Sequence, residues 1–460
     1  MTTDDRAAAS PESSLRRELG VFLGVVVVIN ATIGTGIFKV PAKVARLSGS
    51  MGAALAMWAV GALISLAGAL SLAETAAALP RTGGLYEHLR RAYGPRSAFL
   101  LAWTRMVLLL PAAVGSFARL AAESLQSLRG APTDRAAETA IAIAVIAACA
   151  ALNLTGVRTS ARQQAVVTGA KFVGVAMLGV MGLLCALPAG GVVVPEPAPA
   201  LPFAREVTLG GCFGALVSVM WAYDGWADLS SLSGEVRDPG RSLPRALIAG
   251  TLAIAAVYLL ANVGYARVLG LEGLRRAGTG DRMAASLLAQ AALGAPGRVA
   301  LSALVLVSCV GACMNSLLTG PRVFVPIAAD GEFPRALGAV SARTGTPTTA
   351  VVVSAGLGAL YVSFHSFEQL TDAFVAGMFP FYMLGVGAVF VLRRREPGLH
   401  RPFRVPGYPV VPMVFLAGAA ALLWGAAQDV DRTAWYAFAL MLLGLPAREL
   451  FVRARRRGAR

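Results

Sequence analysis

The sequence predicts an all-α integral membrane protein of twelve transmembrane helices, in which the first and the sixth helix are each broken near the middle. Of the 460 residues, 56% are hydrophobic and only 14% are charged, whereas soluble domains carry about 25% charged residues. The apolar residues gather in runs close to the roughly 20 residues with which a helix crosses the hydrocarbon core. The bilayer therefore takes the place of a conventional core, and no strands are expected.

Twelve such runs follow one another along the chain. They cover residues 21–47, 52–79, 96–127, 136–155, 164–188, 208–233, 243–268, 297–327, 347–366, 369–392, 408–427 and 433–451. A shorter apolar stretch, 281–293, cannot span the bilayer and is expected to form an interfacial or capping helix on the outer face. Most Lys and Arg residues fall on the side that both termini share, which predicts that both termini are cytoplasmic. Arginine greatly outnumbers lysine, which suggests a GC-rich, bacterial genome.

A proline-rich loop at 189–207 divides the chain into two halves, and each half opens with a broken segment. We expect six parts: a cytoplasmic tail at 1–20, a first repeat of five helices at 21–188, an extracellular loop at 189–207, a second repeat of five helices at 208–392, two further helices at 393–451 and a basic cytoplasmic tail at 452–460. Broken helices at matching positions of two inverted repeats indicate a binding site near the bilayer midplane.

The first break lies at Gly34, Thr35 and Gly36, inside the apolar segment 21–47. Unpaired backbone groups cost several kcal/mol each in hydrocarbon, so a break is tolerated only where it is buried in protein or lines a cavity. Free N–H groups near a helix N-terminus favour an anion, and a carboxylate would fit there. A glycine-rich seam for close helix packing is the alternative.

The second break lies in segment 208–233, where Asp224, Gly225 and Asp228 interrupt an apolar run. Acidic residues at membrane depth are costly and usually functional. Aromatic neighbours such as Trp221 could instead be interfacial anchors, but such anchors do not require carboxylates beside them. The sequence therefore points to a second half of the same site.

Lys171 lies inside a predicted span, segment 164–188. A lysine at the membrane centre costs roughly 2.5–3.5 kcal/mol on insertion scales, and Lys171 lies roughly 12 Å along the helix from the start of its segment. A side chain that snorkels to the cytoplasmic interface is the alternative. Glu74 and Arg105 also fall in apolar segments, and the sequence assigns a role to neither.

The composition argues against several other classes of protein. The five cysteines fall in apolar runs without a CxxC spacing, and the three histidines have no suitable partners nearby. We therefore expect no metal site, no cofactor and no enzymatic activity. The net charge of +16 belongs to loops between spans rather than to a nucleic-acid surface. A channel would need rings of filter residues, which the sequence does not suggest.

Several short motifs are specific when taken together. They are Gly34-Thr35-Gly36-Ile37-Phe38 followed by Pro41, Trp221-Ala222-Tyr223-Asp224-Gly225-Trp226 followed by Gly234-Glu235-Val236 and Asp238-Pro239, Pro80-Arg81-Thr82-Gly83-Gly84, and Arg401-Pro402-Phe403-Arg404-Val405-Pro406. This set resembles the amino acid-polyamine-organocation (APC) superfamily, and within it most closely the L-type amino acid transporters and their bacterial relatives.

The resemblance implies a LeuT-like fold of five plus five inverted helices with two added helices, and alternating-access transport of an amino acid across the cytoplasmic membrane. By the family pattern, backbone groups of five residues would hold the substrate carboxylate: Thr32, Ile33, Gly34, Thr35 and Gly36. Backbone groups of three others would hold the α-amino group: Trp221, Ala222 and Asp224. Trp221 would also close over the substrate, and Thr32 and Ala227 would shape its side-chain pocket.

The resemblance also implies how transport is coupled. Lys171 matches the place where sodium-coupled relatives bind a cation, which predicts sodium-independent transport, with exchange of neutral amino acids as the first choice. Proton symport and transport of polyamines or cationic amino acids are the alternatives. Tyr265 and Asn315 are expected to face the interior as coupling or gating residues, although ordinary interhelical hydrogen bonds explain them equally well.

Two residues depart from the family pattern. Lys39 sits where the outer vestibule should begin, and it could favour acidic substrates or reach lipid headgroups. Asp228, which follows Ala227, leaves the size and charge of the pocket open. The outer loop at 128–138 has no cysteine, whereas animal L-type light chains use one there to bind a glycoprotein partner. We therefore expect no disulfide-linked heavy subunit, and a monomer or homodimer in the lipid bilayer.

Overall fold

A computed structural model describes residues 19–80, 83–129, 134–156, 161–184, 206–279, 283–329, 331–428 and 432–458. Within these ranges the regular structure is entirely helical, and the only β-type contact is an isolated bridge between Leu19 and Val236. The all-helical prediction is therefore confirmed for the described chain. The predicted loop 189–207 lies almost wholly outside the described residues, as do most of the tail 1–20 and the end of the tail 452–460.

The helical elements follow one another with short connections. In chain order they are α1 (Val21–Thr32), α2 (Gly36–Leu47), α3 (Met51–Ala78), α4 (Leu85–Tyr93), α5 (Pro95–Thr104), η2 (Arg105–Leu109), α6 (Leu110–Arg129), α7 (Arg135–Leu154), α8 (Ala161–Leu184), α9 (Leu209–Tyr223), η3 (Trp226–Glu235), α10 (Pro239–Thr279), α11 (Ala284–Thr319), η4 (Gly320–Val323), α12 (Phe324–Ala329), α13 (Arg335–Gly338), α14 (Thr348–Phe364), α15 (Phe367–Arg395), α16 (Val410–Ala427), α17 (Thr433–Leu442) and α18 (Gly444–Gly458).

Eight helical stretches of the described chain are long and apolar enough to cross a membrane. They are Met51–Ala78, Pro95–Arg129, Arg135–Leu154, Ala165–Leu184, Pro239–Gly278, Ala284–Ala329, Phe367–Arg395 and Val410–Ala427. The bent pair α1 and α2 adds a ninth. The predicted segments 208–233, 347–366 and 433–451 are also helical but consist of shorter helices. The protein is thus a multi-pass membrane protein.

Both predicted breaks are present. α1 and α2 are bent by 49° across the residues between them. α9 ends at Tyr223, and after Asp224 and Gly225 the chain continues as the 3₁₀-helix η3. The predicted capping helix at 281–293, described from residue 283, is continuous with the next span, because α11 bends at Gly294 (φ +67°) instead of being interrupted by a loop. Glycine adopts this left-handed conformation without a side-chain penalty.

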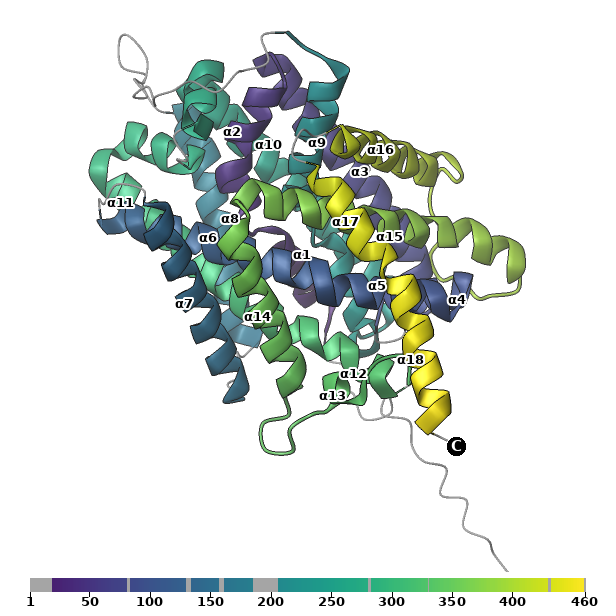
Figure 1. The fold of residues 1–460 in the computed structure, drawn as a ribbon. Coiled ribbons are helices and arrows are strands. Elements are labelled where there is room, and N and C mark those ends of the chain that lie inside the picture. The colour runs from purple at the N-terminus through teal and green to yellow at the C-terminus, as the bar shows by residue number, and fades with distance from the viewer. Residues whose placement is uncertain are drawn as a thin grey trace, which may run out of the picture.

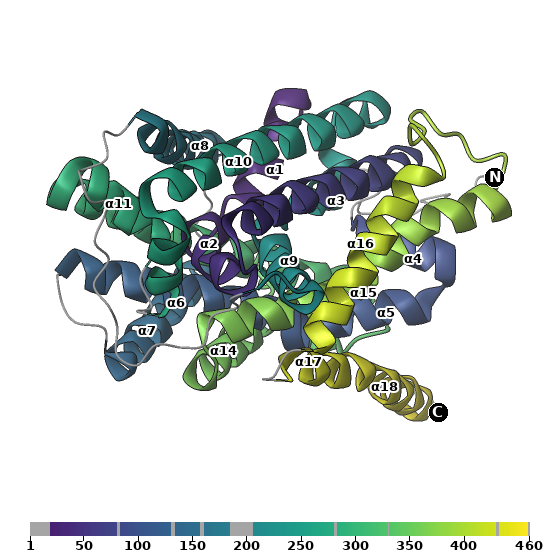
Figure 2. The ribbon, with the colours of Figure 1, turned by 90° about the horizontal axis from the view of Figure 1, so that it is seen from above.

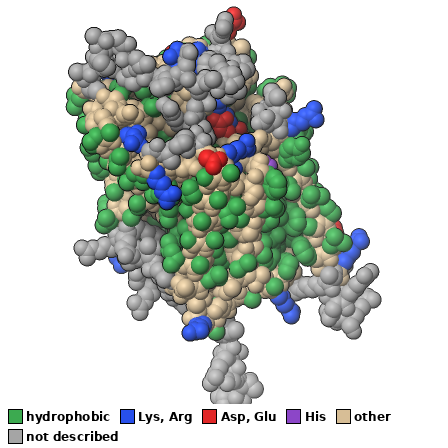
Figure 3. All heavy atoms as spheres, turned by 60° about the vertical axis from the view of Figure 1, so that its left-hand side comes forward, with side chains coloured by type: hydrophobic (Ala, Val, Ile, Leu, Met, Phe, Trp, Pro, Cys, Tyr) green, Lys and Arg blue, Asp and Glu red, His purple; other side chains and the backbone are tan. Residues whose placement is uncertain are grey.

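The two broken helices occupy the interior of the bundle. Figures 1 and 2 show α10 beside α1, and α17 and α18 at the edge of the bundle. α1 also packs against α8, and α9 packs against α2, α3, α15 and α16. Residues 215–223 of α9 are all buried. On the face shown in Figure 3, hydrophobic side chains cover a broad continuous area, as expected of a surface in contact with lipid.

Candidate functional site

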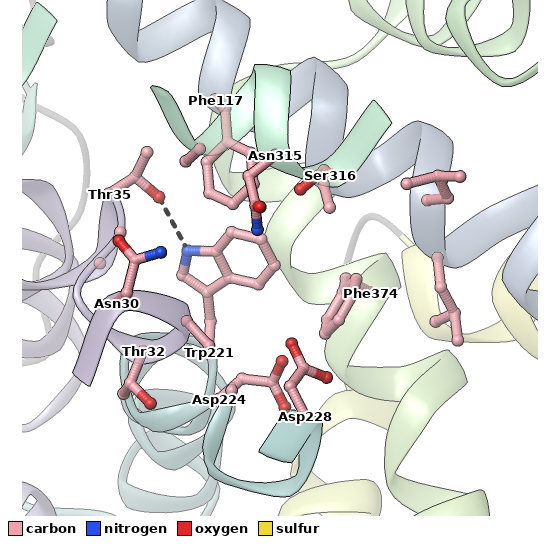
Figure 4. Close-up of a pocket in the computed structure, with 18 of the residues that line it drawn as sticks. Asn30, Thr32, Thr35, Phe117, Trp221, Asp224, Asp228, Asn315, Ser316 and Phe374 are labelled. Carbon is pink, nitrogen blue, oxygen red and sulfur yellow. Dashed lines mark hydrogen bonds between the residues drawn. The ribbon is translucent and has the colours of Figure 1, made fainter. Parts of the chain in front are cut away.

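A cavity of about 130 Å³ lies where the two breaks meet (Figure 4). Its walls come from α1 and α2, from η2 and α6, and from α8, α9, η3, α11 and α15. Pockets for drug-sized ligands usually measure roughly 300–1,000 Å³. The cavity therefore suits a small metabolite.

The first break presents backbone N–H groups to this cavity. α1 ends at Thr32 and α2 begins at Gly36, so the N–H groups of Thr35, Gly36 and Ile37 have no acceptor within a helix. The carbonyl of Thr32 is already engaged, because it accepts a hydrogen bond from the Tyr258 hydroxyl at 3.1 Å. The break thus offers the positive end of a helix and few free acceptors, which favours an anionic group.

The second break is held in place by Gly225 and Tyr382. Gly225 adopts φ +116°, a left-handed conformation that other residues rarely adopt. The Tyr382 hydroxyl donates to Oδ1 of Asp224 at 2.7 Å. Because α9 ends at Tyr223, the carbonyls of Ala222 and Tyr223 have no donor within the helix. Free carbonyls at a helix C-terminus favour a cationic group.

The two breaks are in direct contact. A Cβ atom on Gly36 would lie 2.5 Å from the Cα of Ala222, and a Cβ on Gly225 would lie 2.6 Å from the carbonyl carbon of Ala31. Real Cβ contacts of this length do not occur. Each glycine therefore allows the backbone of one break to pack against the other, which fixes the two helix ends on opposite sides of one small cavity.

Trp221 covers the α2 side of the cavity. Its indole Nε1 donates to the Thr35 hydroxyl at 3.1 Å (Figure 4). Its ring packs against Phe374 and Phe117, with centroid distances of 5.0 and 6.0 Å. Trp221 is itself almost fully buried. Trp221, Phe374 and Phe117 thus lie between the cavity and the residues packed around α2.

Comparison with known proteins identifies the family. The family model described as amino acid permease matches residues 19–445. The chain belongs to this family. The family assignment confirms the resemblance that the motifs indicate, and it favours transport over enzymatic activity.

The chain is similar to several curated amino acid transporters, and the similarity covers nearly their whole length. The chain is 28% identical to the serine/threonine exchanger SteT of Bacillus subtilis, over 95% of this chain and 97% of that protein. It is 27% identical to the human b(0,+)-type amino acid transporter 1, over 98% of this chain and 91% of the relative. It is also 27% identical to the human cystine/glutamate transporter, over 95% and 86%. Amino acid transport is thus the common activity of these relatives.

The permease buries Lys171 beside the first break. The residue is 2% exposed, and its Nζ lies 3.4 Å from Oδ1 of Asn30 in α1. Both residues line the cavity. Lys171 therefore points toward α1 and is not exposed at the surface of the protein.

The structure brings most of the predicted site residues to the cavity, although not all of them. Six of the predicted substrate-binding residues line it: Thr32, Gly34, Thr35, Gly36, Trp221 and Asp224. Three others are buried outside its lining: Ile33, Ala222 and Ala227. Of the predicted coupling residues, Lys171 and Asn315 line the cavity, whereas the Tyr265 hydroxyl donates to the Ile37 carbonyl at 3.2 Å.

The sequence assigns no role to five further residues of the cavity wall: Asn30, Arg105, Phe117, Phe374 and Tyr382. Arg105 is a charged residue in an apolar segment, and that feature alone could have indicated it. The aromatic residues are indistinguishable from core residues in the sequence.

Ion pairs fasten α2 to its neighbours on the far side of Trp221. Lys39 contacts Glu123 of α6 at 2.6 Å, Lys43 contacts Asp372 of α15 at 2.5 Å, and Arg46 contacts Glu368 of α15 at 2.7 Å. The three basic residues follow at intervals of four and three, so they share one face of α2. We call these three contacts the α2 latch. Lys39 is therefore engaged with Glu123 and does not extend to lipid headgroups.

The opposite side of the cavity is open. Asp228 of η3 and Thr319 and Gly311 of α11 are exposed members of the cavity wall. η3 is also joined to the start of α1, because Leu19 and Val236 form the β-bridge. The cavity is thus closed on the α2 side and accessible on the η3 side.

Proposed function

We propose that this permease carries a neutral amino acid across the cytoplasmic membrane by alternating access, independently of sodium and in exchange for a second amino acid. The observation that carries the proposal is the contact between the two breaks. One break offers helix N-terminal amides, which favour a carboxylate, and the other offers carbonyls at the end of α9, which favour an ammonium group. A zwitterionic amino acid has both groups one carbon apart.

The substrate would bind with its carboxylate at residues 32–36 and its α-amino group at Trp221, Ala222 and Asp224. Trp221 would be the lid on the α2 side. Twelve helices arranged as two inverted repeats of five, with two added, would complete the permease. We propose that the α2 side faces outward and that the η3 side and both termini face the cytoplasm.

Lys171 would supply the fixed positive charge that sodium provides in sodium-coupled relatives of this fold. Its burial next to Asn30 of α1 supports this assignment. It would tie α8 to the broken helix, so that substrate binding and helix movement remain coupled. Tyr265 would act in the same movement by holding the Ile37 carbonyl of α2.

Proton symport is the second candidate. Its support is the presence of Lys171, Asp224 and Asp228 in one cavity wall, since ionisable groups within membranes often form proton pathways. Transport of polyamines or cationic amino acids is less well supported, because Lys171 and Arg105 would both oppose a second positive charge.

The test uses the purified protein in liposomes preloaded with unlabelled amino acids. Uptake of labelled alanine, leucine, glutamate and lysine is followed with and without internal amino acid, sodium and a pH gradient. We expect uptake of a neutral amino acid that requires internal substrate and does not require sodium. The control is liposomes that contain the Gly36→Leu variant.

Other results would change the proposal in defined ways. Uptake into empty liposomes that an inward proton gradient drives would establish symport. A strict sodium requirement would reject the role of Lys171. A single species with the mass of one or two chains, in native-gel and crosslinking measurements, would support a monomer or homodimer. Copurification of a disulfide-linked second chain from the native membrane would contradict the prediction of no heavy subunit.

A further inference from the structure

Arg105 occupies an unusual position in the cavity wall. It opens η2, a five-residue π-helical turn between α5 and α6 within the span Pro95–Arg129. Such π turns are rare and frequent at functional sites. Its side chain lines the cavity, and its Nε atom is buried without a hydrogen-bond partner in the described chain. A charged group this deep in a membrane protein requires a compensating partner.

Asp228 is the matching feature on the other wall. Its neighbours in η3, Ala227 and Leu229, are buried, whereas Asp228 is exposed to the cavity. Figure 4 shows the Asp224 and Asp228 side chains on the same side of the cavity, below Trp221. The carboxylate of Asp224 is held by Tyr382, whereas the carboxylate of Asp228 has neither a hydrogen bond nor a contact ion pair among the described residues.

Arg105 and Asp228 line the same cavity and form no ion pair with each other in the described chain. All three residues line the cavity, and the charge of Arg105 acts on the carboxylates of both Asp224 and Asp228, although no ion pair is found between them among the described residues. The structure therefore places a donor group and an acceptor group in the wall of one cavity. A bound molecule can satisfy both at once.

We propose that Arg105 and Asp228 bind the side chain of the transported amino acid, and that this side chain is short, uncharged and able both to donate and to accept a hydrogen bond. Carboxamide and hydroxyl side chains have this property. The carbonyl or hydroxyl oxygen accepts from the Arg105 guanidinium, and the amide or hydroxyl hydrogen is donated to Asp228. This inference rests on the proposed function, because it assigns the side-chain end of the same substrate site.

Charge balance excludes the other side-chain classes. An acidic side chain would meet Asp224 and Asp228, and a basic one would meet Arg105 and Lys171, which line the same cavity. An apolar side chain would remove water from Arg105 and Asp228 and would form no hydrogen bonds with them. Buried polar groups that are left without hydrogen-bond partners are costly in free energy. A site built to hydrogen-bond a substrate hydroxyl or amide rejects an analogue that lacks it.

Threonine and valine form the sharpest pair of probes, because they have nearly the same shape and differ by a hydroxyl in place of a methyl group. In liposomes that contain the intact protein, unlabelled threonine and asparagine should compete with labelled substrate at least about tenfold better than valine and leucine, since tenfold corresponds to about 1.4 kcal/mol. In Asp228→Asn and Arg105→Gln, the ratio of threonine to valine inhibition constants should move at least about fivefold toward one. Alanine uptake should fall by a smaller factor than threonine uptake.

Glu272→Gln is the matched control, because Glu272 is an exposed carboxylate of α10 that pairs with Arg276 outside the cavity. Its threonine-to-valine ratio should stay unchanged. A second readout, the shift in melting temperature that each amino acid produces, reports binding without transport. It should show the same loss of threonine preference.

Three results separate the possibilities. An unchanged threonine-to-valine ratio in both variants, in uptake and in melting shifts, overturns the inference. Equal loss of uptake for alanine, valine and threonine with unchanged melting shifts also overturns it, because Arg105 and Asp228 would then act on movement of the helices. If the intact protein takes up no amino acid at all, the proposed function fails, which is a different outcome.

Discussion

The two ends of the central cavity use their charged residues in different ways. At the α2 end, the latch joins three basic residues of one helix face to three acidic residues of α6 and α15. At the η3 end, Asp228 and Arg105 face the cavity without such contacts in the described chain. The charges at one end are therefore used to hold helices together, whereas those at the other end remain available to a ligand.

The sequences after the two breaks explain part of this difference. After Gly36 the chain resumes as a regular α-helix with a basic residue on nearly every turn. After Gly225 it resumes as a 3₁₀-helix rich in serine. Ser230 and Ser233 donate their hydroxyl groups to the carbonyls of Ala227 and Ser230, both at 2.6 Å. Such local bonds compete with regular helix formation. We infer that η3 is the more easily rearranged end.

The largest effect is expected where the two ends touch. Gly36→Leu should abolish binding and transport, because even a Cβ would overlap the backbone of Ala222 at 2.5 Å. Overpacking costs roughly 1–3 kcal/mol even when side chains can move, and here the obstacle is backbone. Uptake in liposomes and the melting shift with substrate measure the loss.

Gly34→Ala provides the comparison for Gly36→Leu. A Cβ at Gly34 would meet only the Phe117 ring, at 3.3 Å, and that side chain can move by a few tenths of an ångström. The variant should retain most of the uptake. Normal uptake by Gly36→Leu would show that the two breaks do not have to remain in contact, and it would remove the central geometric claim.

Lys171→Ala tests whether the buried lysine couples the two ends. We expect substrate to bind with nearly unchanged affinity and to move about 5- to 150-fold more slowly, the range of typical coupling free energies between sites. Lys171→Arg should recover little, because the larger guanidinium does not fit a nearly fully buried position next to Asn30. Unchanged transport rates in Lys171→Ala would show that Lys171 contributes to packing and not to coupling.

The α2 latch should have a smaller effect that depends on charge. The side chains of the α2 latch are 6–34% exposed. The free energy lost when one of these ion pairs is broken is therefore expected to lie between roughly 0.2–1 kcal/mol, the value for exposed pairs, and roughly 3–5 kcal/mol, the value for buried pairs. Asp372→Lys, which places two positive charges together, should lower exchange about tenfold, since 1.4 kcal/mol corresponds to a factor of ten. Initial rates of uptake provide the measurement.

A charge swap distinguishes the latch from general damage. Lys43→Asp combined with Asp372→Lys should restore much of the rate that either change removes. Arg276→Glu, which disrupts an exposed pair within α10, should leave exchange unchanged. Equal loss in the single and the swapped variants would mean that the latch does not act through charge.

Sequence reasoning could predict the breaks but not the latch. Gly34, Gly36 and Asp224 are conspicuous because each interrupts an apolar run, and a local rule applies to each of them. The partners of Lys39, by contrast, lie 84 residues away in α6, and no local pattern connects the two. The same holds for Arg105 and Asp228, which the sequence shows as two isolated charges and only the fold brings to one cavity. Long-range pairing of charges depends on helix packing, which the hydropathy pattern does not specify.

The smallest effect concerns stability on the η3 side. α4 begins against η3, because the N–H of Gly83 donates to the carbonyl of Ser231 at 3.2 Å. His88 of α4 lies outside the membrane-spanning helices, and its side chain is fully buried with Nε2 unpartnered in the described chain. Burial lowers the pKa of His88 from 6.5 to about 4. The folded protein therefore keeps this histidine neutral at pH values at which the unfolded chain already protonates it.

The sign of the pH effect follows from this difference. Because the unfolded state binds the proton first, the contribution of His88 to stability is fully present above pH 6.5 and is lost as the pH falls toward 4. At pH 5 the loss is roughly 2 kcal/mol, which should lower the melting temperature of the purified protein by a few degrees relative to pH 7.5. His88→Gln should remove most of this difference, because the amide does not titrate, whereas the same change at the exposed His365 should leave it in place. If His88→Gln melts with the pH dependence of the intact protein, the acid-sensitive part lies elsewhere, and α4 does not make the η3 side the weaker end at low pH.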